Sequence, residues 1–133
     1  MRRSHFFQLR HLTSLLALSA LLFSAQAQSN DLDEVNQLLK SGKQAQALAK
    51  VEQSLSSKPR DAQMRFLKGV IQTEMGKPSD AISTFTKLID DYPELPEPYN
   101  NLAVLHASQG QYDKARAALE MAIRTNPSYS TAH

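Results

Sequence analysis

The sequence predicts an all-α protein in which helix-turn-helix repeats form a solenoid. Three residue types recur at intervals of 34 residues, each three times and all in one register. They are the prolines Pro59, Pro93 and Pro127, the glycines Gly42, Gly76 and Gly110, and the alanines Ala47, Ala81 and Ala115. The apolar residues between them follow a helical period, and no run has the polar–apolar alternation of a half-buried strand.

Each recurring residue has a structural reason to recur. The glycines lie between helical patterns, where a left-handed backbone ends one helix and turns the chain into the next. The alanines open the second helix of each pair, where a small side chain allows close approach. The prolines follow the second helix and stop it. We therefore predict three helix pairs, in repeats of about residues 28–61, 62–95 and 96–129.

Apolar stripes mark both helices of each pair. The second helices have the sets Ala47, Leu48, Val51 and Leu55; Ala81, Ile82, Phe85, Leu88 and Ile89; and Ala115, Leu119, Ala122 and Ile123. The first helices have the sets Leu32, Val35, Leu38 and Leu39; Met64, Leu67, Ile71 and Met75; and Tyr99, Leu102, Val104 and Leu105. These spacings are helical stripes and not strand alternation, and Pro78 is expected in the first turn of its helix.

Residues 1–27 have the three parts of an export signal. Three arginines precede an uncharged apolar run over residues 12–23, and Ala25-Gln26-Ala27 offers the small residues that a signal peptidase requires. The apolar run has 12 residues, whereas a transmembrane helix needs about 20. We predict cleavage after Ala27 and a periplasmic or secreted domain over residues 28–133, with an uncleaved N-terminal anchor as the alternative.

The arginines of the signal dominate the charge of the sequence. The whole chain has 15 Lys and Arg against 13 Asp and Glu, a formal net charge of +2. Without the three signal arginines, 12 basic residues face 13 acidic ones, so the predicted mature domain has a net charge of −1. A nearly neutral domain offers no basic surface for nucleic acid or anionic lipid. We expect no nucleic-acid partner and no stable membrane anchor after cleavage.

No catalytic or cofactor-binding constellation is found. The sequence has no cysteine, which excludes a disulfide, a thiolate metal site, a cysteine nucleophile and a lipid-modified cysteine. Only His106 and His133 follow the signal, too few and too far apart for a typical zinc site. No phosphate-binding glycine loop or hydrolase motif occurs. We expect a protein that is not an enzyme, with no catalytic, metal or cofactor site, and His106 as a packing residue.

The register of the third repeat carries a family resemblance. It reads Tyr99-x2-Leu102-Ala103-x2-His106, then Ala115-x3-Leu119, then Ala122 and Pro127, and it resembles the tetratricopeptide repeat. The middle repeat matches that family through Gly69, Gly76, Ala81, Phe85 and Pro93. It departs at Arg65, Lys68 and Gln72, where the family tends to be apolar. The first repeat matches through Gly42, Ala47, Val51 and Pro59 and resembles an atypical end repeat.

The resemblance implies a protein-interaction scaffold that binds a peptide or protein partner in the groove lined by first helices. The residues expected to face that groove are Asn36, Phe66, Val70, Thr73, Glu97, Asn100 and Asn101. Their amide groups suit an extended peptide backbone, although Asn101 alternatively caps or braces neighbouring helices and Phe66 alternatively belongs to the core. The family's basic clamp for a C-terminal carboxylate is not evident, because its places carry Leu32, Asn36 and Glu97.

The apolar face of the last second helix has no following helix in the sequence to cover it. Leu119 and Ile123 lie on this face. Either the sequence is part of a longer protein that continues into a fourth repeat, or the face pairs with another molecule by self-association. The alternative function follows from the first case, in which residues 28–133 are the N-terminal interaction module of a longer exported enzyme.

Overall fold

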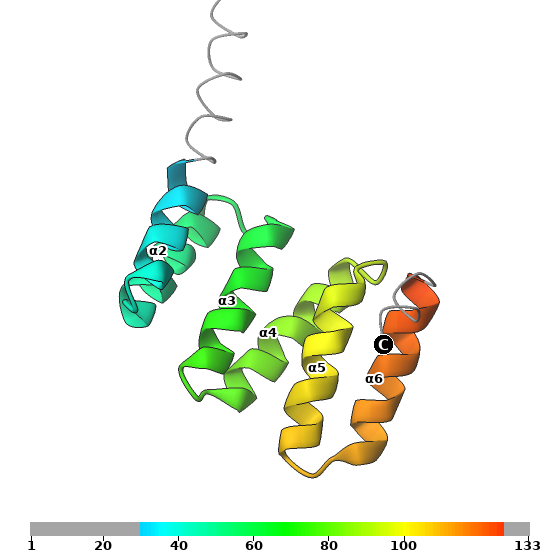
Figure 1. The fold of residues 1–133 in the computed structure, drawn as a ribbon. Coiled ribbons are helices and arrows are strands. Elements are labelled where there is room, and N and C mark those ends of the chain that lie inside the picture. Colours follow the sequence, from blue (N-terminus) through cyan, green and yellow to red (C-terminus); the bar gives the residue numbers. More distant parts are fainter. Residues whose placement is uncertain (1–29, 127–133) are drawn as a thin grey trace, which may run out of the picture.

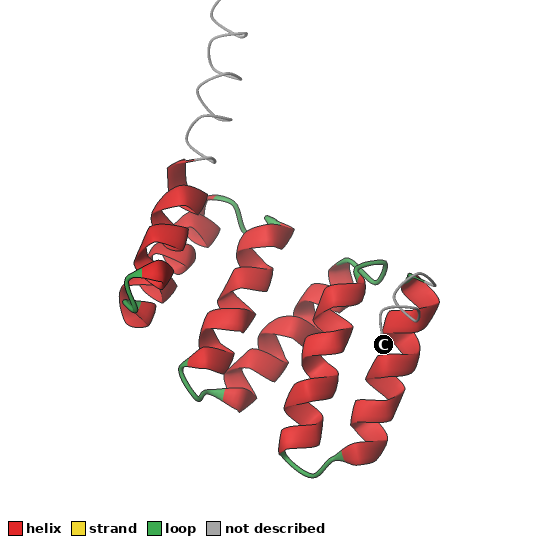
Figure 2. Ribbon diagram, viewed as in Figure 1, coloured by secondary structure: helices red, strands yellow, loops and turns green. Residues whose placement is uncertain are grey.

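The computed structural model describes residues 30–126, which form a row of helices joined by short turns (Figure 1). A first helix covers residues 30–40 of this range. It is followed by α2 (Gln44–Ser57), α3 (Ala62–Glu74), α4 (Pro78–Asp91), α5 (Pro96–Ser108) and α6 (Tyr112–Thr125). The described residues contain only helices and loops (Figure 2), so the predicted all-α repeat fold is confirmed. The predicted signal and Pro127 lie outside the described residues.

Helices that follow one another in the chain also pack against one another. α3 packs on both α2 and α4, and α5 packs on both α4 and α6. The first helix and α6 therefore lie at opposite ends of the row (Figure 1). Such nearest-neighbour stacking is characteristic of solenoids, in which each unit buries its apolar faces against the units beside it.

The three recurring glycines end the first helices as predicted. Their φ angles are 70° at Gly42, 69° at Gly76 and 74° at Gly110, in the left-handed region that favours glycine. In the first turn, the Gly42 amide donates to the Leu39 carbonyl at 3.0 Å and the Lys43 amide donates to the Leu38 carbonyl at 2.9 Å. The same two bonds recur at the other two glycines, so all three turns share the Schellman geometry that satisfies the last carbonyls of a helix.

The second helices begin in one common way. Ala47, Ala81 and Ala115 each occupy the fourth position of their helix, and all three are buried. Pro78 is the first residue of α4, a position whose N–H would have no acceptor within the helix, so the lack of an N–H in proline costs no hydrogen bond there. Pro59 and Pro93 each lie one residue beyond the C-cap of α2 and α4, as expected of residues that stop a helix.

The core consists of two clusters, each spanning more than one repeat. One joins the first helix and α2 to α3 through Val35, Ala47, Val51, Met64 and Ile71. The other joins α4 to α5 through Ala81, Phe85, Leu102 and Leu105. The second helix of a repeat is thus covered by its own first helix and by the first helix of the next repeat.

The closest approach between helices occurs at Gly69 of α3. A Cβ atom at this position would lie 2.6 Å from both Cε1 and Cζ of Phe85, a side chain with no exposed surface. Gly69, one of the residues through which the middle repeat resembles the family, therefore lies at a close contact between the two helices of its repeat. In the 34-residue register, Gly69 and Phe85 correspond to Val35 and Val51 in the first repeat and to Ala103 and Leu119 in the third. In the second and third repeats, a small residue on the first helix accompanies a larger one on the second, whereas the first repeat has valine at both positions.

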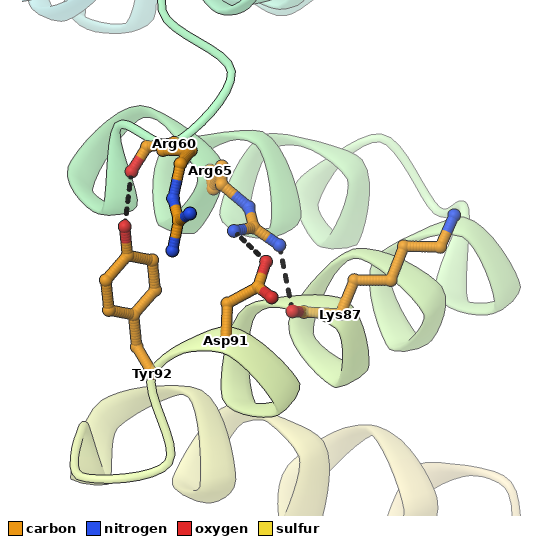
Figure 3. Close-up of polar contacts among 5 residues, drawn as sticks. All are labelled: Arg60, Arg65, Lys87, Asp91 and Tyr92. Carbon is orange, nitrogen blue, oxygen red and sulfur yellow. Dashed lines mark hydrogen bonds and ion pairs between the residues drawn. The ribbon is translucent and has the colours of Figure 1, made fainter.

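Arg65, the first polar departure from the repeat pattern, ties α3 to the end of α4 (Figure 3). Its guanidinium donates to the Asp91 carboxylate at 2.6 Å and to the Lys87 carbonyl at 2.8 Å. This position places a cation at the negative end of α4, where it is favoured. The Tyr92 hydroxyl donates to the Arg60 carbonyl at 2.8 Å and joins the loops that flank the two helices.

The other two departures also have polar partners. Gln72 is buried, and its Oε1 accepts a hydrogen bond of 2.7 Å from the Thr84 hydroxyl of α4. The Lys68 ammonium lies 3.3 Å from the Glu52 carboxylate of α2. Because each polar group is satisfied, these departures replace apolar packing with polar contacts and leave the repeat geometry intact.

Lys50 joins α2 to the first helix through two carboxylates. Its ammonium lies 3.0 Å from Asp31 and 2.9 Å from Glu34. The hydrogen bond from Lys50 lowers the pKa of Asp31, and the hydrogen bonds to Glu34 and Asp31 raise the pKa of Lys50. Both charged forms are therefore favoured at neutral pH.

Candidate partner-binding groove

A pocket lies between the N-terminal turns of α3 and α5. Its volume is about 240 Å³. The lining residues come from the start of α3 and from the junction between the loop and α5, and they are Ala62, Gln63, Phe66, Leu95, Glu97 and Pro98. Both helices are the first helix of their repeat, so the pocket lies on the side of the solenoid where the sequence predicts a groove. Two predicted groove residues, Phe66 and Glu97, line it.

Phe66 forms a rigid wall of this pocket. Its ring centroid lies 5.6 Å from that of Phe85, and the two rings are tilted by 55°. Phe66 is half-buried and packs on the cluster shared by α4 and α5, as does Val70 one turn farther along α3. The two sequence interpretations of Phe66 therefore hold together, because the residue packs on the core with one side and faces the pocket with another.

The matching face of α5 consists of Glu97, Asn100, Asn101 and Val104, which follow a helical spacing from the pocket toward the end of the helix. Val104 is 61% exposed, so it does not share the buried side of α5 with Leu102 and Leu105, the residues with which the sequence pattern grouped it. Val104 lies two helical turns after Glu97 on the same face, and this face is not the one that carries the buried Leu102 and Leu105. The signal that identifies it was in the sequence, since Val104 follows Val70 by 34 residues.

Some of the polar groove side chains already make hydrogen bonds within the protein, and others do not. The Asn101 amide donates to the Glu97 carbonyl at 2.9 Å and so braces its own helix. The Thr73 hydroxyl donates to the Gly69 carbonyl at 2.9 Å. Within the described residues, the side chains of Asn36 and Asn100 make no hydrogen bond, and both are half-buried. These two amides are the ones that remain open to a ligand.

The structure divides the predicted groove residues into two groups. Phe66 and Glu97 meet at the pocket, whereas Asn36, Val70, Thr73, Asn100 and Asn101 lie outside its lining. Sequence reasoning missed the remaining lining residues Ala62, Gln63, Leu95 and Pro98. Leu95 and Pro98 belong to a proline-rich connection, and their part in the pocket depends on how this loop enters α5.

α6 presents a second apolar surface at the end of the row. Leu119 and Ile123 are each 45% exposed, and Tyr112 on the same stripe is 70% exposed. The residues of α4 in the same register as Leu119 and Ile123 are Phe85 and Ile89, and both pack in the cluster that includes α5. Among the described helices, none covers α6 as α5 covers α4.

Residues 30–126 have neither a metal-binding cluster nor a membrane-spanning helix. This part of the chain contains no group of three or more His, Asp or Glu side chains arranged to hold a metal ion. It contains no helix long and apolar enough to cross a membrane. His106 is half-buried, with its Nδ1 atom 2.8 Å from Oε1 of Gln111 at the turn before α6.

Family models match nearly all of the described chain. Two models, each of the tetratricopeptide repeat, match residues 32–96 and residues 72–133. The two matches overlap in the middle repeat and together cover the three helix pairs.

Three solved structures illustrate the similarity in fold. MamA is 15% identical with a TM-score of 0.68, over 73% of this chain and 57% of that chain. YrrB, described as a TPR protein with an unusual peptide-binding site, is 24% identical with a TM-score of 0.65, over 70% of this chain and 48% of that chain. The second TPR of Spaghetti (RPAP3), bound to the HSP90 peptide SRMEEVD, is 14% identical with a TM-score of 0.67, over 73% of this chain and 90% of that chain.

These likenesses establish the fold. The chain spans about half the length of MamA and YrrB, 57% and 48% respectively. At these identities, a similar backbone does not mean that the same residues bind ligands in both proteins.

Proposed function

Because the chain belongs to the tetratricopeptide-repeat family, we propose that it is a non-enzymatic interaction scaffold that binds an extended segment of a partner protein in the groove between α3 and α5. The observation that carries the proposal is the pocket of about 240 Å³ at Phe66. A concave, largely apolar pocket beside open polar groups has the composition of a ligand site. Asn100 supplies one such polar group on the same face of α5.

Two of the structural neighbours give this proposal a precedent. YrrB is described as having a peptide-binding site, and the Spaghetti repeat is bound to a peptide. The alternative function, an interaction module of a longer exported enzyme, uses the same groove. It differs in requiring a catalytic domain outside the 133 residues, which the sequence of the full gene distinguishes.

The groove is tested by equilibrium binding of peptides selected from a random library on residues 28–133. Val104→Glu places a charge on the exposed face of α5 without disturbing the core, and we expect it to weaken binding about tenfold or more. Met121→Glu introduces the same charge at a partly exposed apolar position on α6, and as the control it should leave affinity unchanged. Selection of no binding peptide, or equal loss in both variants, contradicts the proposal.

We also propose that the protein is exported to the periplasm. The charged start, short apolar run and Ala25-Gln26-Ala27 pattern support this location. N-terminal sequencing of the exported protein should begin at Gln28. A mature product that still contains Met1 would favour the uncleaved anchor.

The exposed stripe of α6 leads us to propose self-association of residues 28–133 through Leu119 and Ile123. Burying this apolar surface gains about 25 cal/mol per Å². Sedimentation should detect association that Leu119→Lys with Ile123→Lys abolishes. A polar capping helix fused after His133 should restore a monomer and raise the melting temperature. A stable monomer that gains nothing from the cap would contradict the exposed-face interpretation.

A further inference from the structure

We propose, on the basis of the proposed function, that the pocket between α3 and α5 anchors one large apolar side chain of the partner, and that its acidic rim selects a Lys or Arg next to that anchor. The partner segment is accordingly an extended apolar–basic sequence and not an acidic tail. The argument rests on the walls of the pocket, on its two helix N-termini and on the charges around it.

The walls of the pocket are apolar and held in place. Phe66 is braced by its ring contact with Phe85, and Pro98 is buried within the first turn of α5. Ala62 and Leu95 complete the apolar lining. A pocket with fixed walls binds a side chain without first having to rearrange, which favours affinity. The occupant that matches these walls is a side chain such as leucine, methionine or phenylalanine.

The two helix N-termini at the pocket are poorly suited to an anion. Free backbone N–H groups at a helix start attract negative charge. Pro96 and Pro98 in the first turn of α5 have no N–H to offer. At the start of α3, the Asp61 carboxylate accepts the Met64 amide at 3.1 Å and occupies that site itself. Both helix starts therefore offer fewer free N–H groups to the carboxylates of an acidic peptide than an uncapped helix start without proline would.

The charge around the pocket is mainly negative. Glu97 is exposed and belongs to the lining, and Glu94 and Asp61 adjoin lining residues in the sequence. Two cations lie close in these segments, and both are directed elsewhere: Arg65 pairs with the Asp91 carboxylate, and Arg60 directs its side chain toward the side of Asp91 and Tyr92 in Figure 3. A cationic residue beside the anchor therefore gains attraction to Glu97, and an acidic residue meets repulsion.

The groove continues from the pocket along α3 and α5. Val70 and the exposed Val104 offer apolar surface beyond the pocket, and the open amide of Asn100 lies on the same face of α5 as Glu97 and Val104. An asparagine amide both donates to and accepts from a peptide backbone. The segment is therefore expected to run in an extended form, with its anchor in the pocket and its backbone over α5.

The test uses four labelled peptides of the form Ser-Gly-x-z-x-Gly-Ser, titrated by NMR into residues 28–133, which contain all the described helices. The central residue z is Leu or Ala, and the flanking residues x are both Lys or both Glu. We expect the Leu peptide with Lys flanks to bind about tenfold more tightly than either the Ala peptide or the Glu-flanked peptide.

Two variants separate the parts of the proposal. Ala62→Leu fills the pocket without removing a core contact and should abolish the preference for Leu over Ala, whereas Ala45→Leu at an exposed position in the first turn of α2 should have no effect. Glu97→Gln should abolish the preference for Lys over Glu and retain the preference for Leu. Peptide binding that Val104→Glu blocks but Ala62→Leu leaves unchanged overturns the anchor alone, and no binding by any peptide overturns the proposed function as well.

Discussion

Replacement of Phe85 by alanine is expected to lower the free energy of unfolding by about 3–5 kcal/mol, the cost of truncating a fully buried aromatic side chain. Phe85 has no exposed surface, contacts Phe66, and lies over Gly69. It also belongs to the cluster with Leu102 and Leu105, so its removal leaves a cavity between two repeats. Chemical denaturation followed by circular dichroism measures the loss.

Leu119→Ala is the matched control for Phe85→Ala, because the two residues occupy the same place in their repeats. Leu119 is 45% exposed, since no described helix covers it. We expect a loss well below that of Phe85→Ala. If both substitutions lowered the free energy of unfolding equally, burial between repeats would not determine how much each side chain contributes to stability. The position of the side chain within its repeat would then be the determining factor.

Gly69→Leu is expected to destabilise the protein by about 1–3 kcal/mol through overpacking. The first side-chain atom alone would lie 2.6 Å from the Phe85 ring, and that ring has no open space into which to move. Thermal or chemical denaturation gives the change, and unchanged stability would show that the two helices do not meet at this position.

A double-mutant cycle isolates the contact between Gly69 and Phe85. Gly69→Ala with Phe85→Leu reproduces the pair Ala103 and Leu119 of the third repeat. We expect the double variant to be more stable than the sum of the single variants predicts, by about 0.5–3 kcal/mol. Strictly additive effects would rule out direct coupling between these positions.

The 34-residue register predicted most of the fold, because each recurring residue has a conformation or a size that the local backbone requires. Gly42, Gly76 and Gly110 each take the left-handed conformation that the turn needs. Ala81 and Phe85 are buried as their helical spacing indicates. These requirements depend on residues close in sequence, and the three repeats show the same residues at the same positions.

Features that depend on residues far apart in sequence were not predictable. The partners of Arg65 and Gln72 lie on the facing helix, so the sequence marked both as departures without identifying Asp91 or Thr84 as their contacts. The pocket needs Leu95 to lie near Phe66, which depends on the path of the loop into α5. The sequence pattern grouped Val104 with Leu102 and Leu105 because an apolar residue in a helix resembles a core residue, whichever face it occupies.

Mapping the bound peptide onto the protein tests the central claim most directly. A library-selected peptide would be titrated into isotope-labelled residues 28–133, and the amide chemical shifts of every helix would be followed. Binding in the groove predicts that the largest changes occur at Phe66 and Val70 of α3 and at Glu97, Asn100 and Val104 of α5. Saturable changes confined to α4 or α6, with the first-helix face unaffected, would contradict the assignment of this groove as the partner-binding site.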